Sequence, residues 1–346
     1  MKRRIWTALP LILLLFTGCE RGEDPAYVAS GMDAVENMDY ETAIQYFDEA
    51  IEAQKDQVAA LRGKGIAYMG LGDYVSAVEA FDSALSLTDE KMPDTIRDIR
   101  YYKASALYKA EKYDDTITVC SEMINSAPEG DAYYLRGACF MAREEYDQAK
   151  VDFDNAVKCS PGDYDLYLNI YGCYLEKNRS ADGDVYLKKA LSIQDSSKEA
   201  NYQKARIYFY LEDYDRAKSY LDGLVEEKNQ EAMELMGQIY LAMEDTIHAR
   251  KIYEDCIAAF GETPEYDNGL VLCDLADEDY DGALEHIARG RELPGEEGQQ
   301  ELLYNSIIAW EYKGDFEMAR QKAEEYVAVY PADERGQREY TFLQSR

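Results

Sequence analysis

The sequence predicts an all-α fold in which similar helix pairs follow one another as an α-solenoid. Three observations favour this fold. A small residue returns about every 34 positions, an aromatic residue often stands three positions before it, and a bulky apolar residue often stands four positions after it. Residues spaced by three and four positions lie on one face of a helix. One helix pair cannot bury such a face alone, so neighbouring copies are expected to stack.

The N-terminal residues 1–18 have the pattern of a signal peptide. Lys2, Arg3 and Arg4 form a positive region, and an apolar run of 12 residues follows from Ile5 to Phe16. A membrane-spanning helix needs ~20 apolar residues, so this run is too short to be one. A short apolar run after a positive region is typical of a secretory signal.

The run ends in Leu15-Phe16-Thr17-Gly18-Cys19, which resembles a bacterial lipobox. The resemblance implies transfer of diacylglycerol to the Cys19 sulfur and cleavage after Gly18. Residues 19–23 would then be a short tether, held by palmitate-type acyl chains at the cell membrane or cell envelope, on the extracytoplasmic side. Phe16 departs from the aliphatic residue usual at its position. The alternative is an ordinary cleaved signal with an incidental cysteine.

A frame of 34 positions fits nine copies across residues 24–333. The copies start at Asp24, Val58, Arg97, Gly130, Tyr164, Lys198, Gln230, Pro264 and Gln300. Position 20 of the frame is Ala in seven copies and Thr or Gly in the other two. Because the frame never breaks for long, no domain boundary is expected within 24–333. The closing residues 334–346 are expected to form a capping helix or a tail.

Each copy is expected to hold two helices joined by a short polar turn. Positions 4, 8 and 11 place Leu61, Gly65 and Tyr68 on one face of a first helix, and positions 20, 24 and 27 repeat this spacing on the second. Small residues at positions 8 and 20 allow antiparallel helices to approach closely. Proline at position 32 of three copies ends the second helix. The insertion from Met92 to Ile96 is expected to lie in a loop.

This pattern resembles the tetratricopeptide repeat over about residues 24–333. The resemblance implies helix–turn–helix repeats wound into a right-handed superhelix, a role in binding proteins, and ligand contacts from positions 2, 5, 9 and 12 of the first helices. Copies five, eight and nine depart from it, since Tyr171, Val271 and Ile307 replace the usual small residue at position 8. The carboxylate clamp of the family needs Lys and Asn where copy one has Val28 and Met32, so that clamp is disfavoured.

Aromatic residues at positions 5 and 12 are the candidates for a partner-binding groove. They are Tyr101, Tyr108, Tyr134, Tyr202, Phe209 and Tyr304. Position 2 is acidic from copy three onward, which gives the aromatic floor an acidic edge. Tyrosine offers a large contact area and a hydroxyl for hydrogen bonding. The alternative is that these rings only pack along the stacked helices.

Charge and cysteine content narrow the function classes. The net charge of −32 and the lack of a basic stripe argue against nucleic-acid binding, which depends on lysine and arginine clusters. A protein or peptide partner, basic or aromatic-rich, is expected instead. The six cysteines after Cys19 form no CxxC pair, and they are expected to be buried thiols that act as small apolar side chains. Export would also permit disulfides.

Motifs for chemistry are weak. The segment from Asp277 to Gly282 matches the start of a calcium loop, but the twelfth residue is Ala288 instead of glutamate, and the repeat places the segment in a turn. His248 and His286 each stand alone on a second helix. No nucleophile elbow, phosphate-binding loop or dinucleotide fingerprint occurs. We therefore expect no catalytic residue, no metal, no cofactor and no enzyme.

Two functions fit these observations. The first is a lipid-anchored extracytoplasmic scaffold or adaptor that binds a protein or peptide partner in its concave groove. The alternative is a dedicated subunit of an envelope assembly machine, for outer-membrane protein insertion or for pilus or secretion assembly. An enzyme with a diffuse site among the helices is a third hypothesis without a supporting motif.

Overall fold

A computed structural model of the chain describes residues 26–346. The predicted signal peptide, the predicted lipidation site Cys19 and the predicted tether lie outside the described residues. The described part of the chain forms nineteen helices and no strand. The predicted all-α repeat solenoid is therefore confirmed.

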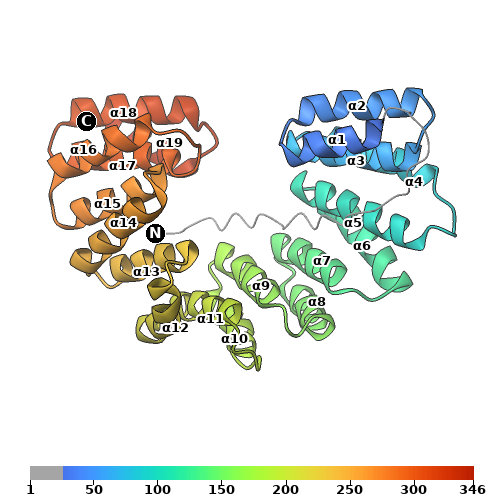
Figure 1. Cartoon of the computed structure of the whole chain (residues 1–346), viewed down its shortest axis with the longest axis horizontal. Helices are drawn as coiled ribbons and strands as arrows, with labels where there is room; N and C mark the ends of the chain where they lie inside the picture. The colour runs from blue at the N-terminus through green and yellow to red at the C-terminus, as the bar shows by residue number, and fades with distance from the viewer. Residues whose placement is uncertain (1–25) are drawn as a thin grey trace. The chain divides into compact units, whose positions relative to one another are not determined.

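The helices alternate between the first and second helix of each copy (Figure 1). The first helices are α1 (Tyr27–Glu36), α3 (Gln57–Gly70), α5 (Pro93–Lys109), α7 (Gly130–Ala142), α9 (Tyr164–Glu176), α11 (Lys198–Tyr210), α13 (Gln230–Ala242), α15 (Pro264–Ala276) and α17 (Gln299–Tyr312). The second helices are α2 (Tyr40–Glu52), α4 (Tyr74–Ser86), α6 (Tyr113–Ser126), α8 (Tyr146–Cys159), α10 (Ser180–Ala190), α12 (Tyr214–Glu226), α14 (Thr246–Phe260), α16 (Tyr280–Glu292) and α18 (Phe316–Val329). A last helix, α19 (Glu334–Gln344), follows.

The chain groups into two compact units, one ending at Ile193 and one beginning at Gln194. In each unit every helix packs against the next helix in the sequence, and the first helices also contact one another. Each unit is therefore a two-layered stack of helix pairs. The frame does not predict this division, because the repeat spacing continues through it.

Small residues bring neighbouring helices together around one large side chain, both within a copy and between copies. All nine position-20 residues, Ala43 among them, are buried. Phe47 at position 24 is fully buried, and a Cβ added at Gly63 would lie 2.4 Å from its ring. Phe81 meets Gly65 in the same way, with a Cβ 2.4 Å from its ring. Only glycine allows such an approach of backbone to ring without a shift.

In every copy a residue with positive φ stands in frame position 15, two residues after the end of the first helix. These residues are Met38, Gly72, Glu111, Glu144, Asn178, Glu212, Glu244, Glu278 and Gly314. A left-handed residue terminates an α-helix and turns the chain back. The next residue is the N-cap, and the second helix begins at position 17, so each turn has the same short geometry.

The expectation of a loop from Met92 to Ile96 is wrong. Helix α5 begins at Pro93, so most of the insertion adds a turn to the first helix of copy three. Proline is favoured in the first turn of a helix, because its missing N–H would have no partner there. Asp94 in the same turn also suits the positive end of the helix.

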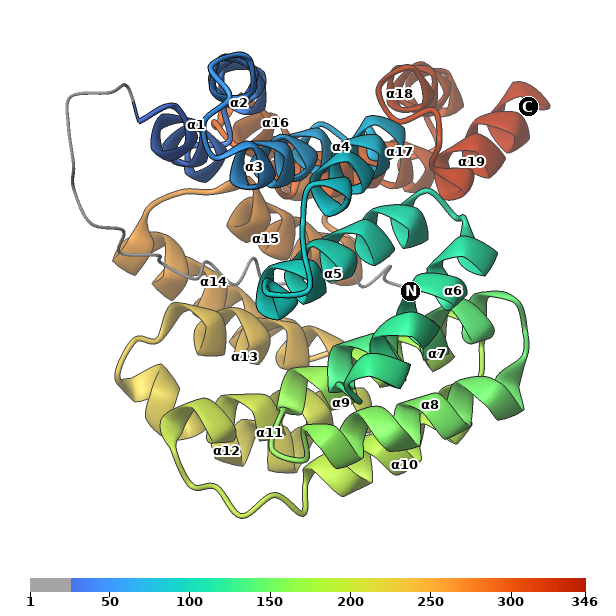
Figure 2. The ribbon, with the colours of Figure 1, turned by 90° about the vertical axis from the view of Figure 1, so that its right-hand side faces the viewer.

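The last helix, α19, follows α18 and packs against the last helix pair, α17 and α18 (Figure 2). Leu343 of α19 is buried in one core with Leu303 and Ile307 of α17. Gly336 lies against the Tyr326 ring of α18, where an added Cβ would be 2.2 Å from a ring carbon. Among residues 26–346, no helix has both the length and the apolar character to cross a membrane.

The six cysteines of the described residues are free thiols. Cys120, Cys139, Cys256 and Cys273 are buried, and Cys173 is half-buried. Cys159 is exposed near the end of α8, so the expectation of a buried thiol is wrong for this residue. Burial raises the pKa of Cys120 to about 12 and that of Cys273 to about 12. Such thiols stay protonated at neutral pH and pack as small apolar groups.

Candidate partner-binding surface

In the unit that ends at Ile193, two of the predicted tyrosines, Tyr108 and Tyr134, lie close to each other and to helix α9. Tyr108 of α5 and Tyr134 of α7 are half-buried and both lie close to Cys173 of α9. The Tyr134 hydroxyl lies 3.9 Å from the Cys173 sulfur, and its ring centroid lies 6.1 Å from that of Phe153. Burial raises the pKa of both tyrosines, so both hydroxyls remain neutral donors.

Tyr101 lies at another part of the same first-helix layer. Its ring stands edge-on to Tyr102 at 6.1 Å between centroids, and burial together with the Asp131 carboxylate raises its pKa. Asp131 carries position 2 of the next copy, so the structure places this acid beside a predicted ring. Asp98, the position-2 acid of the preceding copy, already has a partner. It accepts hydrogen bonds from the Arg62 guanidinium.

In the unit that begins at Gln194, Tyr202 lines a surface hollow. The hollow has a volume of about 230 Å³. Its lining comes from α11, from the end of α12 and from the start of α13: Lys198, Glu199, Tyr202, Leu224, Glu227, Asn229 and Glu231. Burial raises the pKa of Tyr202 to about 12, against the opposing effect of the Arg206 guanidinium.

Two of the three acids of this hollow, Glu199 and Glu231, make no ion pair within the described residues. Lys198 is paired with Glu227, and Glu199 accepts a hydrogen bond of 2.8 Å from the Gln203 amide. Glu231 makes no ion pair within the described residues. The same holds for Glu265, which occupies position 2 of the following copy. The hollow therefore combines a half-buried ring with unpaired negative charge.

Phe209 and Tyr304 do not share this hollow. The Phe209 ring packs against Tyr210 and Tyr214, with centroids 5.8 and 6.0 Å away. The face of Tyr304 is covered by the Arg335 guanidinium of α19, 3.7 Å from the ring centroid. The six predicted residues are thus divided three and three between the two units. Tyr108 with Tyr134 is the one pair among them that the contacts bring together.

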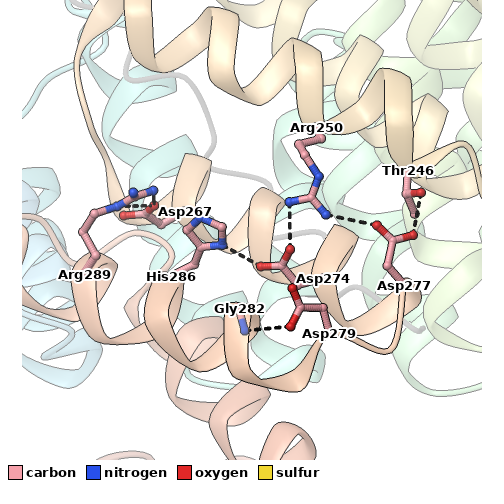
Figure 3. A network of polar contacts seen from close by, with 9 residues as sticks. All are labelled: Thr246, Arg250, Asp267, Asp274, Asp277, Asp279, Gly282, His286 and Arg289. Atoms are coloured by element: carbon pink, nitrogen blue, oxygen red, sulfur yellow. Dashed lines mark hydrogen bonds and ion pairs between the residues drawn. The ribbon is translucent and has the colours of Figure 1, made fainter.

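Sequence reasoning missed a buried polar network in copy eight (Figure 3). Asp274 of α15 is 2% exposed and accepts hydrogen bonds from His286 of α16 at 2.6 Å and from Arg250 of α14 at 2.7 Å. Burial acts to raise the pKa of Asp274, but these two hydrogen bonds outweigh it and lower the pKa. One carboxylate therefore ties three helices together.

A second buried acid lies nearby in the same network. Asp267 is fully buried and accepts a hydrogen bond of 2.9 Å from the Arg289 guanidinium of α16. The calcium-like segment is a turn, in which the Asp279 carboxylate accepts from the Gly282 N–H at 3.0 Å and starts α16. Asp277 binds Thr246 and Arg250. These acids hold helices in place.

A sequence signal for this network exists. Asp267 and Asp274 occupy frame positions 4 and 11, where most other copies have apolar or aromatic residues such as Leu61 and Tyr68. Cations stand at positions 26 and 23 of the same copy, in Arg289 and His286. Acids and cations that replace core residues together in one copy indicate a buried polar cluster.

Comparisons with known proteins identify the repeat. The tetratricopeptide repeat family matches residues 28–92, and a second model of the same repeat matches residues 198–231 and 230–260. These segments are tetratricopeptide repeats. The matched segments lie one in each unit, in copies whose position-20 residues are alanine.

Curated relatives match about half of this chain and a smaller share of their own length. Hsp70-Hsp90 organizing protein 3 of Arabidopsis thaliana is 26% identical over 210 residues, which are 56% of this chain and 35% of that protein. A DnaJ homolog subfamily C member 7 homolog of Dictyostelium discoideum is 24% identical over 54% of this chain and 36% of its own length. The chain thus spans about a third of these relatives.

Solved structures similar to this chain include a tetratricopeptide repeat protein from Parabacteroides merdae, with 15% identity and a TM-score of 0.48 over 72% of this chain and 98% of that one. Pseudomonas aeruginosa pilF is also similar, with 18% identity and a TM-score of 0.38 over 62% of this chain and 96% of that one.

Proposed function

We propose that this chain is a lipid-anchored, extracytoplasmic tetratricopeptide scaffold or adaptor that holds a protein or peptide partner on its first helices. The observation that carries the proposal is the hollow on α11, α12 and α13. The half-buried Tyr202 ring lines this hollow together with Glu199, Leu224 and Glu231. The name of the Arabidopsis relative, an organizing protein for Hsp70 and Hsp90, supports a role in bringing proteins together.

The partner is proposed to carry a basic segment. A lysine or arginine side chain in the hollow would meet the Glu231 carboxylate and the face or edge of the Tyr202 ring, both of which attract cations. The net charge of −32 would speed the approach of such a segment. An acidic partner would meet repulsion at the same place.

The proposal assigns binding instead of catalysis to the chain. The buried polar clusters are engaged in joining helices, as with Asp274 between α14 and α16 and with Arg136 and Asp152 between α7 and α8. The predicted binding residues are aromatic or acidic and lie on first helices. Such a surface supplies contact area and charge, which are what a scaffold needs.

The binding proposal is tested by combining Tyr202→Ala with Glu231→Gln and by comparing the partners captured from gently solubilised envelopes. We expect this variant to lose its partner by at least about tenfold in apparent affinity, because an aromatic anchor and its charge partner are removed together. Tyr312→Ala is the matched control, since Tyr312 is 67% exposed and lies outside the hollow. Unchanged capture by the double variant, with its helix content intact, would refute the assignment.

The anchor is tested separately with Cys19→Ser. The full chain with serine in place of Cys19 is expected to leave the membrane fraction, because no acyl chain can be attached to it. Retention in the membrane would refute the lipid anchor and leave the binding surface untouched. A partner that co-purifies at fixed stoichiometry would favour the assembly-subunit alternative over a transient adaptor.

A further inference from the structure

The unit that begins at Gln194 has a second hollow, at the turns that join first helices to second helices. This turn hollow has a volume of about 340 Å³. Its lining consists of Leu211, Glu212, Asp213, Tyr214 and Asp215 around the start of α12 and of Met243 after α13. Copies six and seven therefore form it together, and it shares no lining residue with the hollow around Tyr202. Its volume has room for one or two side chains of a partner.

Apolar side chains stay exposed at this place. Met243 in the lining is 37% exposed, and Ile247 in the first turn of α14 is 79% exposed. Frame position 18, which Ile247 occupies, is acidic in six of the nine copies, as in Asp215 and Asp281. Single exposed apolar residues are common on protein surfaces, but two at one turn beside a hollow form a patch that gains from being covered.

The rim of the turn hollow is negative. Glu212 and Glu244, one from each copy, directly precede the N-cap residues of α12 and α14 and are exposed. Neither makes an ion pair within residues 26–346. By contrast, Asp213 and Asp215 are paired with cations of α12 at 2.6 and 3.4 Å. Two unpaired carboxylates therefore accompany an apolar spot formed by the exposed or half-exposed side chains of Leu211, Met243 and Ile247.

This combination fits one class of partner. Residues 26–346 form no strand, so they offer an extended peptide no sheet edge to pair with. An amphipathic helix presents an apolar stripe with charged residues on both sides. If those charged residues are lysine and arginine, the stripe matches the apolar spot and the cations match Glu212 and Glu244. A second copy of this chain, with a net charge of −32, would be repelled.

We propose that the turn hollow is a docking surface for a basic amphipathic helix of a protein partner. The apolar face of that helix covers Leu211, Met243 and Ile247, and its lysine or arginine side chains pair with Glu212 and Glu244. This inference goes beyond the proposed function, because its residues lie at turns and not in the hollow around Tyr202.

The experiment titrates the full chain, with Cys19→Ser so that no acyl chain competes, with a helical peptide of about 18 leucine and lysine residues whose leucines lie on one face. A scrambled peptide of the same composition measures the attraction that any cation feels toward so acidic a chain. Methyl NMR of methionine and isoleucine reports the place of binding. We expect the shift changes to concentrate at Met243 and Ile247, and the amphipathic peptide to bind at least about tenfold more tightly than the scrambled one.

Variants separate the apolar contribution from the charged one. Met243→Ala combined with Ile247→Ala should reduce the affinity for the amphipathic peptide at least about tenfold, and alanine already stands at frame positions 14 and 18 in copies three and five. Glu212→Gln combined with Glu244→Gln should weaken binding about threefold in low salt and less in high salt. Val151→Ala is the matched control, since it removes a side chain that is 60% exposed on α8, in the other unit.

The outcomes distinguish this surface from the one proposed around Tyr202. The variant with Tyr202→Ala and Glu231→Gln should keep the shift changes at Met243 and Ile247. Equal affinities for the two peptides, or an unchanged affinity in the variant with Met243→Ala and Ile247→Ala, would overturn the docking surface. Shifts of these two methyl groups that change with protein concentration in the absence of peptide would overturn the partner helix in favour of a second copy of the chain.

Discussion

The two units start their helices in different ways. In the unit that begins at Gln194, eight of nine helices begin with a side chain that accepts a hydrogen bond from the first turn. In the described part of the unit that ends at Ile193, three of ten helices do, capped by Asp39, Asp73 and Asp163. Such a cap contributes about 1 kcal/mol to helix stability.

The difference teaches what decides where a helix begins. Lys112, Glu145 and Arg179 occupy the same frame position as the capping aspartates, yet the second helices after them still start at position 17. The left-handed residue before them and the buried small residue after them are common to all copies. Packing and turn geometry therefore place the helix, and the cap adds stability to a helix already placed.

The units also bury charge differently. In the first unit the Asp152 carboxylate is matched by one guanidinium, that of Arg136, through hydrogen bonds of 2.7 and 2.8 Å. In the second unit Asp274 is matched by His286 and Arg250 from two other helices. Asp152 depends wholly on one bidentate partner, as the fully buried Asp267 of the second unit depends on Arg289 alone, so the loss of such a partner should be among the most damaging changes in either unit.

The largest effect is therefore expected for Arg136→Met. It leaves the Asp152 carboxylate, 2% exposed, without its cation and should lower the free energy of unfolding by about 3–5 kcal/mol. Urea unfolding followed by circular dichroism measures it. Arg143→Met is the matched control, because its partner Asp114 is 86% exposed on its side chain and such pairs contribute at most about 1 kcal/mol. Equal decreases in the free energy of unfolding of the two variants would show that the buried pair stabilises the fold no more than the exposed pair.

The next effect depends on pH and concerns Asp274. Its pKa is lowered by His286 and Arg250, so its stabilising contribution is present above the ordinary carboxyl pKa of 3.8 and is lost as the pH falls through the lowered pKa. Asp274→Asn should cost about 2 kcal/mol at pH 7, and the deficit should shrink as the pH approaches 3. Thermal unfolding at both pH values measures the change.

Copy six supplies the control for that prediction. Its position-11 and position-23 residues are Tyr208 and Tyr220, whose rings stack with centroids 5.6 Å apart where copy eight has Asp274 and His286. No carboxylate takes part in this ring contact, so Tyr220→Phe should change stability by the same amount at pH 7 and pH 3. A deficit of Asp274→Asn that is also equal at both pH values would contradict the assigned role of the charge.

The repeat frame predicted the backbone well because its signals are local. Position 17 begins the second helix in every copy, from Tyr40 to Phe316. The error at Pro93 arose because an insertion was assigned to a loop, although a proline followed by an acid also suits the first turn of a helix. The repeat spacing alone does not distinguish a loop insertion from an added helical turn.

The candidate site was predicted less completely, because contacts between copies depend on how the helices are offset. Tyr108 and Tyr134 lie together beside Cys173. Predicting this contact would require the axial offset between helices α5, α7 and α9. Arg335 of α19 covers the Tyr304 ring. Predicting this contact would require knowing how α19 docks. The repeat frame predicts which residues share a helix face, whereas the packing between copies determines which of these side chains stay exposed to a partner.

The smallest effect tests the capping difference itself by exchanging it between the units. Asp279→Ala removes a cap from α16 and should cost about 1 kcal/mol, whereas Lys112→Asp adds one to α6 and should gain up to about 1 kcal/mol. The backbone at Lys112, with φ −84 and ψ 65, already resembles that at Asp279, with φ −87 and ψ 75, so no rearrangement is needed. Urea unfolding measures both, and Lys112→Ala separates the new cap from the loss of lysine. A Lys112→Asp variant no more stable than Lys112→Ala would mean that the first unit lacks caps because its turns cannot use them.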